Sequence, residues 1–482
     1  MQELIDRALD AAQRSGASYA DIRIVERDGE SLTVKNGALE SAEASRTAGL
    51  GVRLLLDGAW GFASSALLEP DEAERVAREA ADVARASASA RRDDVELDDT
   101  PPARGRYETP VTEDPFSISL DEKLRTLLEA DREMAAVPGV TIREGSLDWG
   151  RERKTFASSE GAHTEQEIVE AGGGIEATAV NDSEVQLRSY PQGSGGQLVT
   201  GGFEAVRSLD LPGNGRRIAE EAVALLDAPQ CPAGEMTVIL ESSQLAQQVH
   251  ESCGHPIELD RVLGMEASFA GTSFLTLDKL EGFRYGSELV NIDADATAAG
   301  GLGTFGWDDE GIPAQNVPIV SAGEFVGYLT SRETAPRIGR RSMGSSRAWG
   351  WNRIPLIRMT NISLRPGSDG GLEDLISDTS DGIYLETNRS WSIDDRRLNF
   401  QFGTQVGWLI KNGRRTTLVR NPTYTGITPR FWAGCDAIAD ASAWVQWGVP
   451  NCGKGEPMQT GHVGHGASPA RFRNVQVGVG RW

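Results

Sequence analysis

Two histidines five positions apart constrain the local fold of this chain more than any other feature of its sequence. They stand at the two ends of the segment His250-Glu251-Ser252-Cys253-Gly254-His255, and only five histidines occur among the 482 residues. On a regular α-helix the side chains of residues i and i+5 point about 140° apart, so they cannot reach one ion. For the two imidazoles to act together, the helix must widen into a π-turn or end between them. Pro256 favours the second geometry, because the residue before a proline avoids the helical region.

The residues of this segment are the types that a catalytic zinc site uses. Zinc binds imidazole nitrogens and thiolates, and a catalytic site keeps one position open for water. A nearby carboxylate must accept the proton of that water. His250 and His255 supply two ligands, and Glu251 supplies the base. The alternative, two ordinary histidines in a helix and its exit, gives Glu251 no role.

The sequence offers several candidates for the third ligand that such a site requires. Cys253 lies between the histidines but on a different face of the helix, where we expect it to pack in the core. Cys452 stands in a glycine-rich loop, and Lys454 nearby would favour its thiolate. The remaining candidates are two carboxylates, which could ligate or instead support the histidines, and a rival histidine pair: Glu258, Asp260, His462 and His465.

The composition argues against several classes of function. The formal charge of −23 creates a field that repels phosphate, which disfavours nucleic acid and anionic membrane surfaces as partners. The N-terminus lacks the basic start and apolar stretch of a signal peptide, and no run of about 18 apolar residues occurs. Four cysteines in a chain of this length do not form a disulfide scaffold. We therefore expect a cytoplasmic protein with no nucleic-acid partner and no membrane contact.

Helical and strand patterns occur in the same order twice within the first 230 residues. The first unit has a helix at 2–15, strands at 19–25, 31–36, 39–44, 49–55 and 60–64, and a helix at 70–91. The second unit has a helix at 121–136, strands at 140–147, 154–158, 165–179 and 184–190, and a helix at 216–226. An acidic, proline-bearing connector, residues 92–117, separates them. This order predicts a duplicated α+β unit in a domain spanning residues 1–230.

The character of the sequence changes near residue 230. A short apolar strand at 236–240 precedes a helix that Ser242 or Ser243 can cap, with Leu245 and Val249 on its inner side. Beyond residue 262 strand and turn signals dominate. The sequence therefore predicts a strand-rich C-terminal domain, residues 231–482, and an α+β protein overall.

Together with the segment at 250–255, later blocks of the sequence resemble the signature of the TldD/PmbA family of peptidases. The blocks follow one another in the family's order, and the N-terminal order of helices and strands is also similar. They are Gly306-Trp307-Asp308-Asp309-Glu310-Gly311-Ile312-Pro313, Pro355-Leu356-Ile357-Arg358-Met359-Thr360-Asn361, Cys452-Gly453-Lys454-Gly455, Gly464-His465-Gly466-Ala467-Ser468-Pro469 and Phe472-Arg473-Asn474-Val475-Gln476-Val477-Gly478. The resemblance covers essentially the whole chain.

This resemblance implies a zinc-dependent peptidase of the TldD type. It implies one zinc ion per catalytic subunit, bound by His250, His255 and Cys452, with Glu251 as the general base. Family members hydrolyse unfolded or extended peptides inside a closed dimer, and some act on leader peptides. The dimer partner is a second copy or a PmbA-type (TldE) subunit that lacks the motif. The chain departs from the family's glycine-rich motif interior by having Ser252-Cys253-Gly254 followed by Pro256.

Further polar residues are candidates for contacts with the ligands or with the substrate. They are Glu258, Asp260, Arg358 and His465. Arg358 could neutralise a buried carboxylate or hold substrate, or it could form a structural ion pair. The acidic run 308–310 is interpreted as a solvated turn or an interface rather than as catalytic groups.

Two other functions remain open at this stage. A non-catalytic subunit could close the chamber of a catalytic one, although such a subunit should lack the histidines and Glu251. A metal-binding peptide carrier would retain zinc and would not depend on Glu251. In any of these roles, the strand-rich half could bind an extended peptide by adding it to a sheet edge, which reads the main chain and gives broad specificity.

Overall fold

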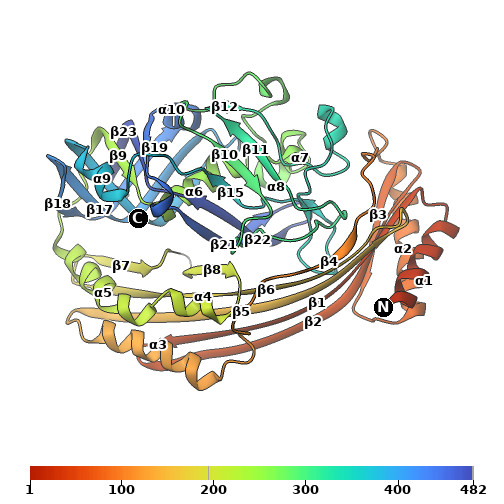
Figure 1. Ribbon diagram of the computed structural model, residues 1–482, viewed down its shortest axis with the longest axis horizontal. Coiled ribbons are helices and arrows are strands. Elements are labelled where there is room, and N and C mark those ends of the chain that lie inside the picture. The colour runs from red at the N-terminus through yellow and green to blue at the C-terminus, as the bar shows by residue number, and fades with distance from the viewer. Residues whose placement is uncertain (194, 480–482) are drawn as a thin grey trace.

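One curved, eight-stranded sheet forms the base of the molecule, and the C-terminal half lies over it (Figure 1). The computed structural model describes residues 1–193 and 195–479. The strands follow the order β3-β2-β1-β5-β6-β4, and β7 and β8 also pair with β6. Their bounds are β1 Tyr19–Lys35, β2 Ala38–Leu56, β3 Ala59–Ser65, β4 Arg104–Glu108, β5 Val140–Ser158, β6 His163–Val180, β7 Val185–Tyr190 and β8 Gln197–Thr200.

Strands β1 and β2 are long and unbroken, whereas the sequence predicts two shorter strands in place of each. β1 pairs along its length with β2 on one side and with β5 on the other. The Asp28-Gly29 pair therefore lies inside β1 and not in a turn. Turns form instead at Asn36-Gly37 and Asp57-Gly58, where each residue has a positive φ, as a two-residue hairpin loop requires. β5 likewise joins the two strands predicted at 140–147 and 154–158.

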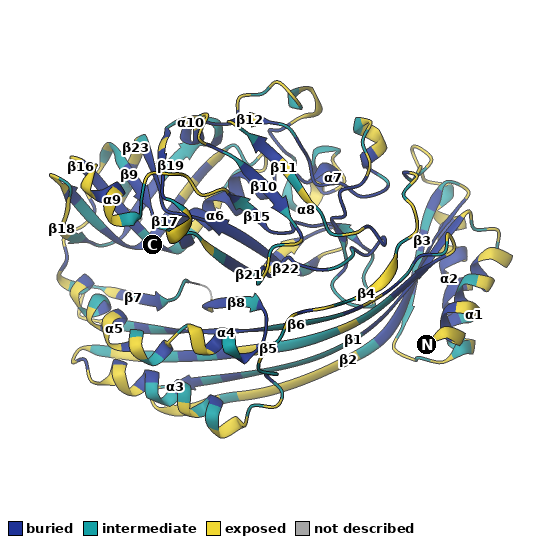
Figure 2. Ribbon diagram, in the orientation of Figure 1, coloured by how far each residue is buried: buried dark blue, intermediate teal, exposed yellow. Residues whose placement is uncertain are grey.

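Helices α1 to α5 cover this sheet in two groups. α1 (Gln2–Arg14) and α2 (Pro70–Ala88) bury alanine-rich faces against β1 and β2. α3 (Leu120–Ala135), α4 (Phe203–Ser208) and α5 (Leu211–Asp227) share a second core with β5 and β6. Figure 2 shows exposed residues along the outer sides of these helices. The order helix, strands, helix therefore occurs twice, as the sequence predicts.

The predicted connector, residues 92–117, contributes to the sheet and reaches the C-terminal half. It contains β4, which pairs in parallel with β6. Upstream of β4, the Arg332 Nε donates a hydrogen bond of 3.1 Å to Asp98 Oδ1, and the Arg332 Nη2 donates one of 2.8 Å to Asp98 O. The segment thus links the base sheet to the structure above it.

A seven-stranded sheet forms the main layer of the C-terminal half. Its order is β16-β9-β23-β19-β17-β18, β20 pairs with β23, and an additional β16–β17 pairing closes five of these strands into a ring. The bounds are β9 Gly234–Leu240, β16 Asp381–Ile393, β17 Asn399–Lys411, β18 Arg414–Val419, β19 Pro422–Ile427, β20 Cys435–Ile438 and β23 Ala470–Val479. The helices and strands together confirm the predicted α+β class with a strand-rich C-terminal half.

Smaller sheets and short helices complete this half. A four-stranded sheet has the order β12-β11-β10-β15, and two hairpins pair β13 with β14 and β21 with β22. The strands are β10 Ile292–Asp295, β11 Asn316–Ser321, β12 Glu324–Phe325, β13 Ser346–Arg347, β14 Leu356–Ile357, β15 Ile362–Leu364, β21 Val445–Lys454 and β22 Gln459–Ala467. The helices are α6 Ser242–Val249, α7 Leu259–Val262, α8 Ala267–Ala270, α9 Leu372–Ser377 and α10 Thr428–Ala433. Among the described residues, none of the helices is long and apolar enough to cross a membrane.

The acidic run Asp308-Asp309-Glu310 is buried against the base sheet. Lys154 Nζ lies 2.9 Å from Asp309 Oδ1, and Arg53 Nη1 lies 3.1 Å from Glu310 Oε1. Arg23 Nη1 lies 3.8 Å from Asp309 Oδ2. The interpretation as a solvated turn is therefore wrong, and the alternative of an interface is the one the structure forms.

Candidate metal centre

The helix that carries the two histidines begins at a carboxylate cap. Glu241 precedes α6, and its Oε2 accepts a hydrogen bond of 2.8 Å from the backbone N–H of Ser243. The expectation that Ser242 or Ser243 caps this helix is wrong, because both hydroxyls donate to Glu241 instead. Leu245 and Val249 face the core, as predicted, and fix which side of the helix is buried.

The helix widens by one residue directly after α6. Residues His250–Gly254 form a π-helical turn, closed by a 3.2 Å hydrogen bond from the His255 N–H to the His250 carbonyl. Of the two predicted geometries, the widened turn is the one that forms. His255 keeps helical dihedrals (φ −67°, ψ −42°), so the following Pro256 does not displace it and the expectation drawn from Pro256 is wrong. The imidazole rings of His250 and His255 lie 4.9 Å apart between centroids.

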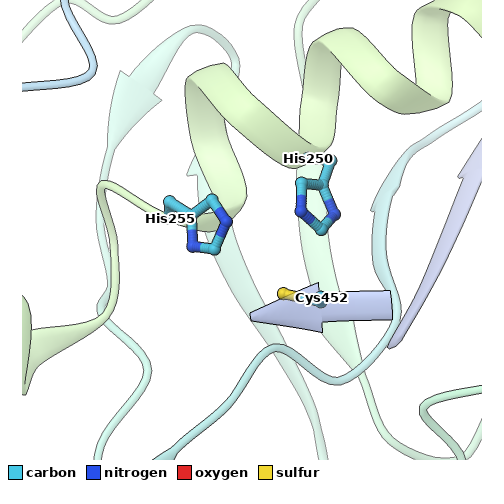
Figure 3. A group of neighbouring side chains, drawn as sticks. All are labelled: His250, His255 and Cys452. Carbon is cyan, nitrogen blue, oxygen red and sulfur yellow. The ribbon is translucent and has the colours of Figure 1, made fainter. Parts of the chain in front are cut away.

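A thiol from the far end of the chain faces these rings. Cys452 lies on β21, and Figure 3 shows its sulfur facing the imidazoles of His250 and His255. One ligand atom from each of the three residues lies within 4.8 Å of the other two, and all three side chains are buried. Tetrahedral ligand bonds of about 2.0–2.3 Å place donors about 3.3–3.8 Å apart, so these three atoms can reach one zinc ion after small side-chain movements. The donor set therefore fits a metal ion.

The strand that carries Cys452 is held by Arg358. The Arg358 guanidinium donates to the carbonyl of Cys452 and, over 3.4 Å, to the carbonyl of Gln459 across the β21–β22 hairpin. A Cβ on Gly461 would lie 2.5 Å from Arg358 Nη2, so glycine is needed for this approach. Among the described residues Arg358 makes no salt bridge, so the prediction of an ion pair at this side chain is wrong. Its contacts are with the backbone carbonyls of Cys452 and Gln459.

One of the two rival histidines contacts the cluster and the other does not. His250 Nδ1 and His465 Nε2 lie 2.7 Å apart, and His465 Nδ1 lies 3.0 Å from the carbonyl oxygen of Ile362. His462 instead pairs its Nδ1 with Glu170 Oε2 of the base sheet at 2.7 Å. Burial lowers the pKa of His250 well below its usual value and that of His465 to about 4. The rings are therefore neutral near pH 7.

A group of buried charges stands behind His255. His255 Nδ1 lies 3.0 Å from Glu258 Oε2, and Lys454 Nζ lies 3.3 Å from the same oxygen. Lys454 also contacts Asp260 Oδ1 and Glu266 Oε2, each at 2.9 Å. Burial alone would raise the pKa of Glu258, but Lys454 and His255 hold it well below its usual range. Glu258 is therefore the carboxylate partner of His255, and Asp260 belongs to the Lys454 side of the group.

Lys454 favours the thiolate of Cys452, as the sequence suggests, but burial outweighs this effect. Burial raises the pKa of Cys452 to about 11, and this effect outweighs the opposing influence of Arg358 and Lys454. The ammonium of Lys454 is engaged by three carboxylates, which explains its weak effect. A bound cation is what would hold this thiol in its anionic form. Cys253 is buried in the core, as predicted.

Glu251 lies at the wall of a cavity beside the three donors. This cavity has a volume of about 250 Å³, and His250, His255 and Cys452 also line it. Burial raises the pKa of Glu251 to about 7, with Arg397 opposing the rise. Arg397 Nη1 lies 3.8 Å from Glu251 Oε2. A carboxyl group with this pKa can exchange a proton with water near neutrality.

Sequence reasoning misses several residues of this cavity. Arg397 lies in the turn between β16 and β17, with its backbone in the left-handed region (φ 61°). Its Nε is buried and has no hydrogen-bond partner in the described part of the chain. The other missed lining residues include Gln247, Asn388 and Trp391. None of them belongs to a motif with characteristic spacing. Gln247 alone could have been found, because it lies one helical turn before Glu251.

A larger cleft runs between the base sheet and the C-terminal half. It has a volume of about 790 Å³, and its floor includes Ser31 and Glu170 on the sheet. Trp349 and His462 line the opposite side, with their ring centroids 4.4 Å apart. Pro450 lines both this cleft and the cavity at Glu251. The two spaces therefore both border Pro450 of β21.

Comparisons with known proteins point to one family. Sequence profiles of the PmbA/TldA metallopeptidase domain 1, central domain and C-terminal domain match residues 20–84, 113–226 and 233–478. A metalloprotease from Methanocaldococcus jannaschii is 30% identical over 92% of this chain and 94% of its own length. A metalloprotease from Methanothermobacter thermautotrophicus is 30% identical over 95% of each chain. The crystal structure of TldE from Thermococcus kodakarensis has the same fold, with a TM-score of 0.75 at 16% identity over 98% of this chain and 99% of that one.

Proposed function

Because the chain belongs to the PmbA/TldA metallopeptidase family, we propose that it is a zinc-dependent peptidase that hydrolyses unfolded or extended peptides. The observation that carries this proposal is the meeting of His250, His255 and Cys452 with Glu251 at one cavity. Two imidazoles, a thiolate and a nearby carboxylate are the residue types of a catalytic zinc site with one open position. The relatives named metalloproteases support the same assignment.

The three donors are proposed to hold one zinc ion per subunit. Two nitrogen ligands and one sulfur ligand suit zinc better than magnesium or calcium, which prefer oxygen. Bound there, zinc would lower the pKa of a water molecule and polarise the scissile carbonyl. Glu258 and Arg358 support this assignment, since they contact His255 and the backbone of Cys452 without occupying the cavity themselves.

Glu251 is proposed to act as the general base. Its carboxylate takes a proton from the attacking water and later returns it to the leaving amine. Burial places its pKa at about 7, so both protonation states are accessible near neutral pH. Arg397, 3.8 Å from the carboxylate, limits that rise and keeps Glu251 ionised often enough to accept a proton.

The free edge of β21 supports binding of an extended peptide. β21 pairs with β22 alone among the described strands, and on its other edge the main-chain groups of Gly448 bond to the side chains of Gln192 and Gln197. A peptide could therefore add to this edge only beyond Gly448. Residues Gly448 to Gly453 of this strand line the cavity at Glu251. A peptide added along that edge would pass Cys452 with its main chain hydrogen-bonded, which is sequence-independent recognition. The cleft beyond Pro450 provides room for the rest of the peptide.

The enclosure of the site favours unfolded substrates and an assembled partner. A cavity of about 250 Å³ admits a peptide segment but not the surface of a folded protein.

We propose a dimer, with a second copy or with a TldE-like subunit, and leader or modified peptides among its substrates. We also propose a cytoplasmic location without nucleic-acid or membrane contacts, and two domains divided near residue 230, since the core of the C-terminal half is separate from those of the base sheet.

Replacement of the base tests the proposal. Glu251→Gln removes the proton acceptor and keeps the shape of the side chain, so we expect zinc content to remain and hydrolysis of an unfolded protein such as reduced casein to disappear. His163→Gln, on β6 outside both spaces, is the matched control and should keep full activity. Residual activity above about 1% in Glu251→Gln would remove Glu251 from this role, because loss of a general base costs about 10²–10⁴-fold.

A peptide carrier is the rival that the same variant separates. A carrier would bind zinc and peptide and would show no turnover in the unmodified protein. The carrier would be favoured if the unmodified protein and Glu251→Gln bind peptide equally well and neither hydrolyses it. Comparison of a folded substrate with its unfolded form then tests the enclosed site, because equal cleavage rates would contradict it.

A further inference from the structure

A second buried imidazole stands directly behind one of the two histidine ligands. His465 lies on β22, and its side chain is fully buried. Its Nε2 is 2.7 Å from His250 Nδ1, and its Nδ1 is 3.0 Å from the carbonyl oxygen of Ile362 on β15. The two rings cross nearly at right angles, 82° apart, with centroids 4.8 Å from each other. The three groups form a chain of hydrogen bonds that starts at a backbone carbonyl and ends at a proposed ligand.

The backbone carbonyl determines the direction of these hydrogen bonds. A carbonyl oxygen only accepts, so His465 Nδ1 must carry the proton that faces Ile362. A neutral imidazole then has an acceptor at Nε2, and His250 Nδ1 must donate to it. His250 in that tautomer has its lone pair on Nε2. A cationic His465 would donate from both nitrogens and would force His250 to protonate Nε2, the atom that a ligand must keep free.

The structure around His465 is fitted to an imidazole in this place. A Cβ on Gly464 would lie 2.1 Å from Asn361 Oδ1, and a Cβ on Gly466 would lie 1.8 Å from the Trp444 ring. Gly464 thus lets β22 approach Asn361 next to β15, and Gly466 makes room for the Trp444 ring. The Gly466 N–H donates to Ser363 Oγ over 2.8 Å, which fixes the register next to the Ile362 carbonyl. These contacts position the acceptor of His250 and leave the ring little freedom.

The two histidine ligands are supported in different ways. His255 Nδ1 faces the carboxylate of Glu258, which is joined to Lys454 and its acidic partners. His250 Nδ1 faces an uncharged ring that, within the described part of the chain, is otherwise hydrogen-bonded only to a carbonyl. Both partners leave the Nε2 atom free, but only Glu258 adds negative charge behind the ligand. The site therefore obtains two oriented imidazoles with one buried anion instead of two.

We propose that His465 is a positioning residue that holds His250 in the Nδ1–H tautomer and directs the Nε2 lone pair of His250 at the metal. This proposal rests on the zinc site of the proposed function. It assigns the second histidine of His462-x-x-His465 to the support of a ligand, and it excludes His465 as a ligand itself. Residues of this kind change metal affinity about 10- to 100-fold when they are removed.

Nitrogen NMR of the metal-free protein tests the tautomer directly. Only five histidines occur in the chain, so ¹⁵N-histidine labelling gives few signals, and single His→Gln variants assign them. We expect a protonated Nδ1 on both His250 and His465 near pH 8. In His465→Leu, the His250 signals should shift toward the Nε2–H tautomer. A protonated Nε2 on His250 in the unmodified protein would overturn the proposal, whatever its metal content.

Metal titration tests the consequence for binding. Zinc or cobalt alone is titrated into the metal-free full-length protein against a chelator of known affinity. We expect His465→Leu to lose about 10- to 100-fold in affinity and to change the visible cobalt spectrum. His465→Gln, whose amide oxygen can accept from His250 Nδ1, should lose less than about 10-fold. His462→Gln, three residues away and bonded to Glu170, is the matched control for metal affinity.

The outcomes separate this proposal from the proposed function. Unchanged zinc affinity and an unchanged cobalt spectrum in His465→Leu overturn the role of His465, although the zinc site itself stands. If His250 and His465 both have the expected tautomers but the protein binds neither zinc nor cobalt, the zinc site is overturned and the chain of hydrogen bonds stands. The proposal is also overturned if folded His465→Gln loses as much metal affinity as folded His465→Leu. Such a result would show that the imidazole ring matters and that a hydrogen-bond acceptor for His250 Nδ1 does not.

Discussion

The two halves of the molecule differ in how far apart in the sequence their contacting segments lie. In the base sheet, β1 pairs with β2 across a two-residue turn, and its most distant partner is β5, more than 100 residues later. In the C-terminal half, β9 pairs with β23 more than 200 residues later. The candidate metal centre lies where such distant segments meet, because His250 follows β9 and Cys452 lies on β21. Damage to the base sheet should therefore remain local, whereas the metal centre depends on closure of the whole C-terminal half.

The largest effect is expected at the ligand from the far end of the chain. Cys452→Ser should lower zinc content to near zero and abolish hydrolysis, a greater loss than the roughly 10- to 100-fold that supporting residues cause. Metal analysis of the purified protein measures it, with far-UV circular dichroism to show that the base sheet is intact. Unchanged zinc stoichiometry would point instead to Glu258 as the third ligand.

A smaller but global effect is expected where the two halves touch. Asp309→Asn removes the carboxylate that faces the buried cation Arg23 and leaves Lys154 with Glu152 alone, which should cost about 3–5 kcal/mol of unfolding free energy. Urea denaturation measures this loss. Asp82→Asn removes an exposed partner of Arg85 and should change stability by less than about 0.5 kcal/mol. Equal losses in the two variants would mean that the contact between the halves contributes little.

The ion pairs of Glu152, in the base sheet next to this contact, should make the stability of the protein sensitive to acid. Burial alone would raise the pKa of Glu152, but Lys154 and Arg27 lower it to about 2 in the folded protein. Since the unfolded chain binds this proton near pH 4.3, the group stabilises the fold above that pH by about 3 kcal/mol and loses this contribution as pH falls toward 2. Unfolding free energies between pH 5 and 3 should fall more steeply in the unmodified protein than in Glu152→Gln. Parallel curves would contradict the assignment.

The smallest effect is expected from a steric change inside the base sheet. A Cβ on Gly61 of β3 would lie 1.9 Å from the Ala80 carbonyl of α2, so Gly61→Ala should cost about 1–3 kcal/mol. Gly150→Ala, whose Cβ would meet only the Asp28 carbonyl at 3.6 Å, is the control for stability. Zinc affinity should be unchanged in Gly61→Ala. A loss of zinc in this variant would show that the two halves do not tolerate damage independently.

Sequence reasoning succeeds where the controlling interactions are local. The i, i+5 spacing of His250 and His255 requires a distorted helix, and the π-turn is one of the two forms it predicts. Apolar spacing places α1 and α6 within a residue or two, because it reports one buried face. The sequence prediction wrongly splits β1 into two strands around Asp28-Gly29. The pairing that keeps β1 extended there comes from β5, more than 100 residues away.

The remaining features of the site depend on tertiary contacts. No local pattern distinguishes His465, which contacts His250, from His462, which contacts Glu170. Arg397 reaches the cavity only because β16 and β17 return to it, and its turn has no characteristic sequence. Polarity suggests that the acidic run at 308–310 is exposed, but its cationic partners come from strands of the base sheet within the first 160 residues. Such partners are visible only after the chain is folded.

The π-turn at His250 also fixes the phase of the chain that follows it. One extra residue in the turn rotates every later side chain by about 100° relative to a continuing α-helix. The turn thereby sets where the chain leaves the helix, and Glu258 then reaches both His255 and Lys454 on the side away from the cavity. Deletion of a single residue between Glu251 and His255 would restore regular helical spacing for the two imidazoles, yet it would shift His255 and Glu258 relative to Lys454. The length of this segment, as much as the identity of its ligands, therefore sets which charges lie behind the metal face.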